Sequence, residues 1–155
     1  MTNEELKTVI TELQLAVVFD EAVDANGWYT ANVEPANWFA FAGQLRNRPE
    51  LQFNFLFCAT CVDWKTHLTM VYHLRSTIHK HELVVKAKLD RTNPEIETVS
   101  GIWRGAEFLE REVYELFGVN FLNHPDLRLL ILPDGWEGKK PLLKDFEDPI
   151  NMIRL

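Results

Sequence analysis

The cysteine pair Cys58 and Cys61 is the first place where residue types and spacing could carry chemistry. A Cys-x-x-Cys sequence is used by redox-active dithiols and forms half of many zinc sites. The pair follows a strand-like run, and residues three apart on a strand point to opposite faces of a sheet. The sequence has no second Cys-x-x-Cys, and Val62 and the residues after it do not predict the helix N-terminus that lowers the pKa of a reactive thiol. The pattern therefore favours two small buried residues, with a redox or metal site as the alternative.

Four of the five histidines, His67, His73, His79 and His81, lie near one another in the sequence and could form a metal site. No acidic or cysteine residue stands at a convincing ligand spacing from them, and alternating strand positions explain His79 and His81 equally well. Histidines that bind metals usually come with carboxylates that orient their rings. Structural histidines are therefore favoured over metal ligands.

Other common catalytic signatures are missing from the sequence. It contains neither a G-x-G-x-x-G nor a Walker A loop, so nucleotide binding has no local support. Its serines, Ser76 and Ser100, do not lie in a G-x-S-x-G elbow, which argues against a serine nucleophile.

A further candidate for chemistry is a group of charged residues near the end of a predicted helix, because paired carboxylates can act as general acid and general base. Glu110, Arg111, Glu112 and Glu115 fall on the helix face opposite its apolar residues. Glu107 precedes Arg111 by one turn, in the acid-then-base order that stabilises a helix. From the pattern alone, a solvated helical face is the favoured interpretation.

Helices are expected where apolar residues recur every three or four positions. Thr2 or Asn3 can cap the first helix, and Pro35 suits the first turn of the second, which stops before Pro49. Gly118 can end the third helix in a left-handed conformation. The predicted helices cover residues 4–18, 35–48 and 102–117.

Strands are expected where aromatic and β-branched residues alternate with polar ones. The predicted strands cover residues 28–33, 52–57, 68–74 and 82–89. The last three of these form a meander of antiparallel pairs. Together the elements predict a single-domain α+β fold, with N-terminal helices packed on a mainly antiparallel sheet, one later helix, and an extended irregular C-terminal strap.

Length and composition are those of an ordinary folded chain. The 155 residues suffice for one domain, and 46% hydrophobic and 25% charged residues are typical of globular proteins. The net charge of −7 has the wrong sign for binding nucleic acid or anionic lipid. No apolar run approaches the roughly 20 residues that cross a bilayer, and the acidic N-terminus is unlike a secretory signal. A cytoplasmic location is expected, and it is compatible with membership of a membrane-attached assembly.

Residues 118–155, the C-terminal strap, show neither helical nor strand period although they contain many large apolar residues and four of the seven prolines. Disorder is disfavoured, because each large apolar group left in water forgoes roughly 1.5–3 kcal/mol. We therefore expect residues 1–117 to form the globular domain and residues 118–155 to pack on another protein.

The string from residue 110 to residue 145 resembles the C subunit, or 30 kDa-type subunit, of respiratory complex I, NADH:quinone oxidoreductase. It reads EREVYELFGVNF over residues 110–121, HPDLR over 124–128, LP at 132–133, WEG at 136–138, PL at 141–142 and KDF at 144–146. Leu129 and Leu143 stand where the family commonly has arginine, so some basic contacts with a neighbour are expected to be lost there.

The resemblance implies an α+β protein in the peripheral arm, on the cytoplasmic face of the inner membrane. Its main partner would be the quinone-site D subunit of complex I, with contacts to the iron–sulfur B and I subunits and no nucleic acid. It would carry no cofactor and no catalytic residue, while flavin mononucleotide and iron–sulfur clusters would lie in partner subunits. The complex would transfer electrons from NADH to quinone and translocate protons.

The resemblance also implies a partner interface. Arg111 would lie in a partly buried ion network, His124 and Pro125 would fix the path of the strap, and Trp136 would be its anchor. The predicted interface residues are Glu110, Arg111, Glu112, His124, Pro125, Asp126, Arg128, Trp136, Lys144 and Asp145.

Two other functions stay open from the sequence. The homologous accessory subunit of a membrane-bound nickel–iron hydrogenase, or of a ferredoxin- or deazaflavin-dependent relative, shares the same string. An independent small enzyme or metal-binding module would instead use the cysteines and histidines, and stoichiometric zinc in the purified chain would support it.

Overall fold

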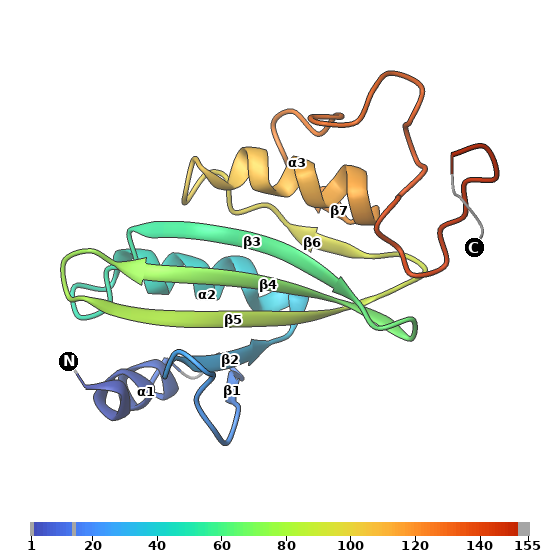
Figure 1. Cartoon of the computed structure of the whole chain (residues 1–155). Helices are drawn as coiled ribbons and strands as arrows, with labels where there is room; N and C mark the ends of the chain where they lie inside the picture. The colour runs from blue at the N-terminus through green and yellow to red at the C-terminus, as the bar shows by residue number, and fades with distance from the viewer. Residues whose placement is uncertain (1, 14, 152–155) are drawn as a thin grey trace.

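The computed structural model describes residues 2–13 and 15–151, whose arrangement is shown in Figure 1. The helices are α1 (Asn3–Thr11), α2 (Pro35–Asn47) and α3 (Ala106–Phe117). The strands are β1 (Val18–Phe19), β2 (Tyr29–Val33), β3 (Phe55–Asp63), β4 (His67–Ser76), β5 (His81–Asp90), β6 (Glu95–Glu97) and β7 (Asn120–Leu122). The predicted α+β fold is confirmed.

A mixed sheet with the strand order β1-β2-β5-β4-β3 forms the centre of the molecule. β3, β4 and β5 make the predicted antiparallel meander, whereas β2 runs parallel to β5. β6 and β7 form a separate parallel pair, with α3 between them in the sequence. The prediction of a mainly antiparallel sheet is confirmed. The sequence did not predict the parallel pairing of β2 with β5 or of β6 with β7.

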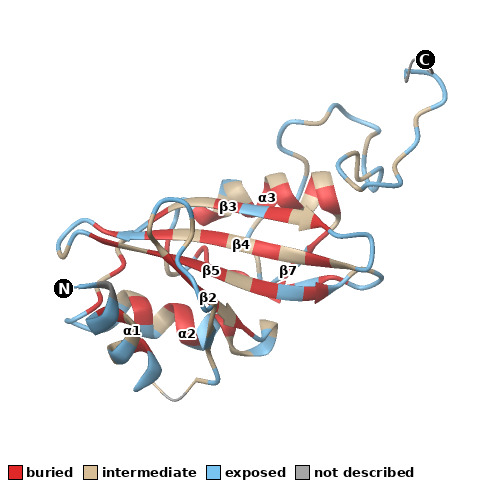
Figure 2. Ribbon diagram, turned by 60° about the horizontal axis from the view of Figure 1, so that its bottom comes forward, coloured by how far each residue is buried: buried red, intermediate tan, exposed pale blue. Residues whose placement is uncertain are grey.

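The core lies between α2 and one face of the sheet. Trp38 of α2 stacks on Tyr72 of β4 with ring centroids 4.3 Å apart, and Trp103 lies 6.3 Å from Trp38 on the same stack. The indole N–H of Trp103 donates to the carbonyl of Phe53 at 2.8 Å. Figure 2 shows buried residues along the strands and helices, while the segment from the end of β7 to residue 151 is intermediate or exposed.

Helix α1 is shorter than predicted. Thr2 caps it, and reciprocal hydrogen bonds between Thr2 and Glu5 form a capping box. The helix ends at Thr11 rather than at residue 18, because residues 18–19 pair with β2 instead. Ala16 has a φ of 49°, which is outside the helical region. Strand pairing therefore overrides the helical spacing of these apolar residues.

Strand β3 begins later than predicted. The sequence placed a strand over residues 52–57, but β3 covers residues 55–63 and so contains both Cys58 and Cys61. Gln52 has a φ of 42°, which breaks the extended backbone before the strand. The register shifts between Leu56 and Cys58, as in a β-bulge. The predicted helix at α2 is confirmed. The third predicted helix, 102–117, is confirmed from Ala106 onward, whereas residues 102–105 precede it outside the helix, and Gly118 ends α3 with a φ of 80°.

Candidate functional site

Three charged residues of α3 are buried, so the predicted solvated face is wrong. Glu110, Arg111 and Glu115 are 0%, 6% and 3% exposed. Arg111 and Glu115 form hydrogen bonds with residues 128–132, so the first part of the C-terminal strap lies against this helix. Burial of charged groups requires that each be hydrogen-bonded or paired, and each of these three is.

Arg111 holds the strap through two carbonyl groups. Its Nε donates to the carbonyl of Arg128 at 3.1 Å, and its Nη2 donates to the carbonyl of Leu129 at 2.6 Å. Asp126 lies 3.9 Å from Nη1 and itself accepts from Arg128 at 2.9 Å. The contacts of Arg111 within the chain are therefore with the strap, and its predicted role toward a partner stays a prediction.

Glu115 holds the residues that follow. Its carboxylate accepts hydrogen bonds from the backbone N–H groups of Leu130 at 2.8 Å, Ile131 at 2.9 Å and Leu132 at 3.2 Å. Three successive amides thus converge on one buried carboxylate. The predicted interface left Glu115 out, although the sequence analysis placed it among the charged residues of this helix and in the EREVYELFG string.

Glu110 and His124 meet beneath the start of the strap. Glu110 accepts from the Thr98 hydroxyl and, at 2.9 Å, from the Val99 N–H, while burial raises its pKa to about 7. Nε2 of His124 lies 3.0 Å from the carbonyl of Glu107 and 3.7 Å from Oε2 of Glu110. Nδ1 of His124 accepts from the backbone N–H of Asp126 at 3.0 Å. These partners require that Nε2 carries the proton in the neutral ring.

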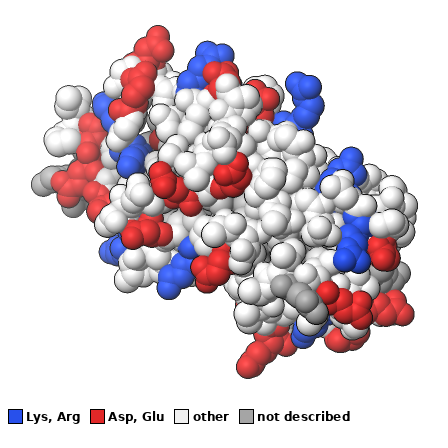
Figure 3. Space-filling model, turned by 180° about the vertical axis from the view of Figure 1, so that it is seen from behind, with Lys and Arg blue, Asp and Glu red and all other residues white. Residues whose placement is uncertain are grey.

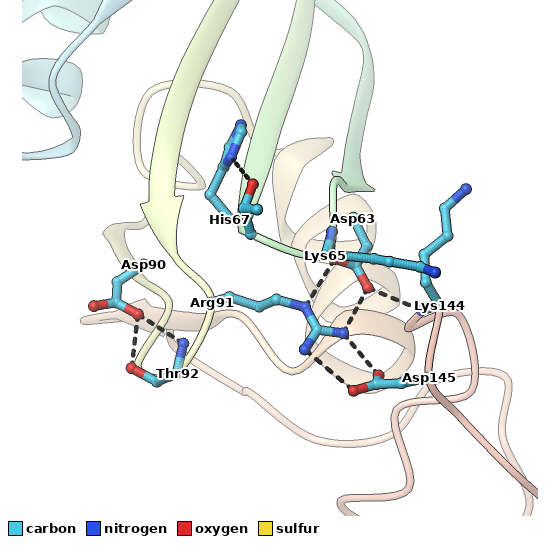
Figure 4. A network of polar contacts seen from close by, with 9 residues as sticks. Asp63, Lys65, His67, Asp90, Arg91, Thr92, Lys144 and Asp145 are labelled. Atoms are coloured by element: carbon cyan, nitrogen blue, oxygen red, sulfur yellow. Dashed lines mark hydrogen bonds and ion pairs between the residues drawn. The ribbon is translucent and has the colours of Figure 1, made fainter.

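A second attachment lies at the other end of the strap, and Figure 4 shows it. Asp63, at the end of β3, accepts two bonds of 2.8 Å from the Arg91 guanidinium and one of 2.8 Å from the Lys144 N–H. Arg91 also donates to Asp145 at 2.7 Å. These bonds, chiefly those from Arg91, hold the pKa of Asp63 well below its usual range. We refer to Asp63, Arg91, Lys144 and Asp145 as the distal latch.

Asp63 and Arg91 were missed by the sequence analysis. They lie outside the string that carries the family resemblance. Asp63 ends β3 and Arg91 follows β5, and nothing in the sequence indicates that these two charged residues pair with each other. Lys144 was predicted as an interface residue, but it contributes its backbone N–H here, while Figure 4 shows its side chain pointing away from Asp63.

The remaining predicted interface residues take no part in the hydrogen bonds of these attachments. Trp136 is half-buried. Its ring centroid lies 6.5 Å from that of Phe146 and 4.2 Å from Nζ of Lys139. Glu112 is half-buried on the side of α3 near Cys58, and Pro125 is exposed. Nothing within the described part of the chain brings these three together, and their interface role stays a prediction.

The cysteines and histidines form structural contacts. Cys61 is buried and Cys58 is half-buried, as expected for opposite faces of a strand, and both are free thiols. Burial raises the pKa of both, that of Cys61 to about 12, which keeps them protonated. His79 and His81 lie 2.8 Å from the carbonyls of residues 49 and 51. Over residues 2–13 and 15–151, no group of three or more His, Cys, Asp or Glu is placed to hold a metal ion.

The family match and the relatives found by sequence comparison agree with one another. The family described as "Respiratory-chain NADH dehydrogenase, 30 Kd subunit" matches residues 31–149. The chain is 42% identical over 113 residues to the C/D subunit of NADH-quinone oxidoreductase from Phocaeicola vulgatus, covering 72% of this chain and 22% of that protein. It is 46% identical over 99 residues to the C subunit of F(420)H(2) dehydrogenase from Methanosarcina mazei, covering 63% of each. The chain therefore spans less than two thirds of the length of these two relatives.

A third relative is matched over more of its length. The chain is 35% identical over 127 residues to the C subunit of NADH-quinone oxidoreductase from Roseiflexus sp., covering 80% of this chain and 72% of that protein.

Solved structures share the fold. A trypsin-resistant fragment (1–134) of Nqo5 has a TM-score of 0.65 at 25% identity, covering 80% of this chain and 98% of that chain. A chain of the membrane-bound sulfane sulfur reductase, an archaeal respiratory membrane complex, has a TM-score of 0.72 at 27% identity, covering 93% of this chain and 85% of that chain. Since the family match covers most of the sequence and the fold agrees, the chain belongs to the family of 30 kDa subunits of respiratory-chain NADH dehydrogenase.

Proposed function

We propose that the chain is a structural component of the peripheral arm of a proton-translocating NADH:quinone oxidoreductase. It holds the quinone-site D subunit in place and does not itself react with NADH or quinone. Flavin mononucleotide and the iron–sulfur clusters lie in partner subunits, and this chain carries no cofactor.

The observation that carries the proposal is the C-terminal strap. Arg111 and Glu115 fix its backbone on α3, while large apolar side chains along it stay exposed to solvent. The exposed fractions are 39% for Leu130, 65% for Ile131, 52% for Leu142 and 91% for Ile150. Apolar side chains left exposed on a segment with a fixed backbone are suited to burial against a protein partner.

The D subunit is proposed as the main partner. The relative from Phocaeicola vulgatus is named as a C/D subunit, and the present chain matches 22% of its length. That name joins the C and D subunits, which supports direct contact between the two where they are separate chains. Contacts with the iron–sulfur B and I subunits belong to the same proposal.

Attachment to the membrane would occur through the complex, on the cytoplasmic face of the inner membrane. Across residues 2–13 and 15–151, no helix has the length and apolar character needed to cross a bilayer. On the face in Figure 3, the visible lysines and arginines are dispersed among acidic side chains. Together with the net charge of −7, this disfavours direct binding to anionic lipid or nucleic acid.

The 46% identity to the F(420)H(2) dehydrogenase relative favours a second candidate. In that case the chain would serve the same structural role in a relative of complex I that takes electrons from another donor, such as a deazaflavin, ferredoxin or hydrogen. A membrane-bound nickel–iron hydrogenase is included among these relatives.

A tagged pull-down of the chain from detergent-solubilised membranes tests both candidates. Bound flavin together with NADH oxidation by quinone would support the complex I proposal. Nickel with hydrogen turnover, or activity with a deazaflavin or ferredoxin but not NADH, would move the chain to a relative. Recovery of the chain alone would contradict the structural role.

A further inference from the structure

We infer that Glu110 is a buried proton-binding site, which exchanges its proton with solvent through the hydroxyl groups of Thr98 and Ser100. The three residues form one hydrogen-bonded chain between α3 and the segment that follows β6. The proposed function assigns no proton chemistry to this chain, so the site would be an additional property of it.

The Glu110 carboxyl is shielded from water and from positive charge. Its side chain is 0% exposed, and among the residues that the structure describes only His124 comes within ion-pair distance, with Nε2 3.7 Å from Oε2. The Asp126 N–H donates to Nδ1 of His124, so the ring is neutral in this arrangement. A buried carboxyl without a counter-charge favours its protonated form.

The other ionisable groups that surround Glu110 do not provide this counter-charge. From the sheet, Tyr72 of β4 is fully buried, and burial, followed by the charge of Glu110, raises the pKa of its hydroxyl well above the usual value. Tyr72 therefore stays neutral. The guanidinium of Arg111 is bound to carbonyls of the strap, and Asp126 and Arg128 pair with each other at 2.9 Å.

The hydroxyl of Thr98 can support both protonation states of Glu110. It lies within hydrogen-bond distance of Oε2 of Glu110 and 2.9 Å from Oγ of Ser100. Because one hydroxyl carries one proton, Thr98 donates either to the ionised carboxylate or to Ser100. In the second case the protonated carboxyl donates to Oγ1 of Thr98. The Val99 N–H donates to the other oxygen of Glu110, so both states are hydrogen-bonded without a change in the backbone.

Ser100 brings this chain of hydroxyls to the molecular surface. The exposed fraction rises from 0% at Glu110 to 7% at Thr98 and 9% at Ser100. A surface depression of about 380 Å³ is lined by Ser100, Gly101, Arg104, Glu107 and Pro125. A depression of this size admits water, which can exchange a proton with the Ser100 hydroxyl.

Proton uptake by ionised Glu110 then takes three transfers. A hydronium ion or buffer acid in the depression gives a proton to Oγ of Ser100, and the proton of Ser100 moves to Oγ1 of Thr98. The proton of Thr98 moves to Oε2 of Glu110. Each hydroxyl oxygen forms one O–H bond and breaks one, so the only net change is one proton bound to the carboxylate. Release follows the same steps in reverse.

The first test asks whether Glu110 holds a proton close to neutral pH. Burial raises the pKa of Glu110 to about 7, whereas ordinary carboxyl groups are ionised at pH 6. In infrared spectra of the purified full chain at pH 6, a carboxylic-acid band should be present in the wild type and in Glu107→Gln, a change at a half-exposed carboxylate on the same helix. The band should be absent from Glu110→Gln. A wild type without the band, or a band that persists in Glu110→Gln, would overturn the inference.

The second test measures the path of the proton. With ¹³C-labelled glutamate, relaxation dispersion of Cδ of Glu110 at pH 7 reports the rate of proton exchange. Ser100→Ala removes the hydroxyl that links Thr98 to solvent, and it should slow this exchange by roughly ten-fold or more without moving the titration midpoint of Glu110. Ser100→Thr, which keeps a hydroxyl, should exchange at the wild-type rate.

Ser76→Ala is the matched control, because Ser76 is the other serine of the chain and is buried at the end of β4. It should leave the exchange rate of Glu110 unchanged. An unchanged rate in Ser100→Ala, or equal slowing in Ser100→Ala and Ser100→Thr, would overturn the hydroxyl path. Neither result bears on the proposed function, which the pull-down tests separately.

Discussion

Replacement of Glu110 by glutamine should remove a large part of the pH dependence of stability. The Glu110 carboxyl is fully buried, and its pKa rises from 4.5 to about 7 in the folded chain. A group with a raised folded-state pKa stabilises fully below pH 4.5, and this contribution is lost as the pH rises through 7. At about 1.4 kcal/mol per pKa unit, the loss between pH 4.5 and pH 8 is about 3 kcal/mol. Glutamine stays neutral, so the variant should lack this loss.

The assay is urea unfolding of the isolated chain at pH 5 and pH 8, followed by tryptophan fluorescence. Between pH 5 and pH 8, the wild type should lose about 2.5 kcal/mol more of its unfolding free energy than Glu110→Gln. Asp126→Asn is the control, because Arg128 lowers the pKa of Asp126 and confines its effect to acid below about pH 4. Equal pH dependence in the wild type and Glu110→Gln would refute the burial argument.

Further predictions concern the two attachments of the strap and the cysteines. Asp63→Asn should weaken the distal latch, so trypsin should cleave the strap of this variant several-fold faster than that of the wild type; an unchanged cleavage rate would show that the latch is not needed. Because Arg91 lowers the pKa of Asp63, its contribution to stability should persist down to about pH 4 and be lost only as the pH falls further, as an acid titration of the unfolding midpoint can measure. Arg111→Ala and His124→Ala should reduce the amount of assembled complex seen on native gels, and normal amounts of complex with lost quinone reductase activity would contradict this. Cys61, with a pKa of about 12, should react with a maleimide at pH 8 at least a hundred-fold more slowly in the folded chain than in urea, and rapid labelling would support a redox role instead.

The sequence predicts those elements whose structure depends on local pattern. Helix α2 follows from Pro35 and its apolar spacing, α3 from its apolar face and Gly118, and the meander from alternating residues in β4 and β5. The errors occur where distant pairing decides the structure. Residues 18–19 leave the helical pattern to pair with β2, and the short strands β6 and β7 are stable only because they pair with each other.

The residues of the candidate site likewise fall into those that the sequence identifies and those that it does not. The family string identifies Arg111, His124 and Asp126, which the structure brings together at the start of the strap. It does not show that Glu115 binds three amides, because hydrogen bonds from a side chain to a distant backbone leave no period in a sequence. Asp63 and Arg91 were missed for the same reason.

The distal latch also bears on the order in which the chain folds. The bond from the Lys144 N–H to Asp63 joins residues 81 positions apart, whereas β6 and β7 join residues 25 positions apart around α3. Closing a longer loop costs more chain entropy, and long-range contacts generally form late in folding. During synthesis, residues 144 and 145 also leave the ribosome after α3 and residues 128–132. The strap would thus gain its attachment to α3 first and the distal latch only once residue 144 is available, so that a chain cut before residue 144 presents an unlatched strap.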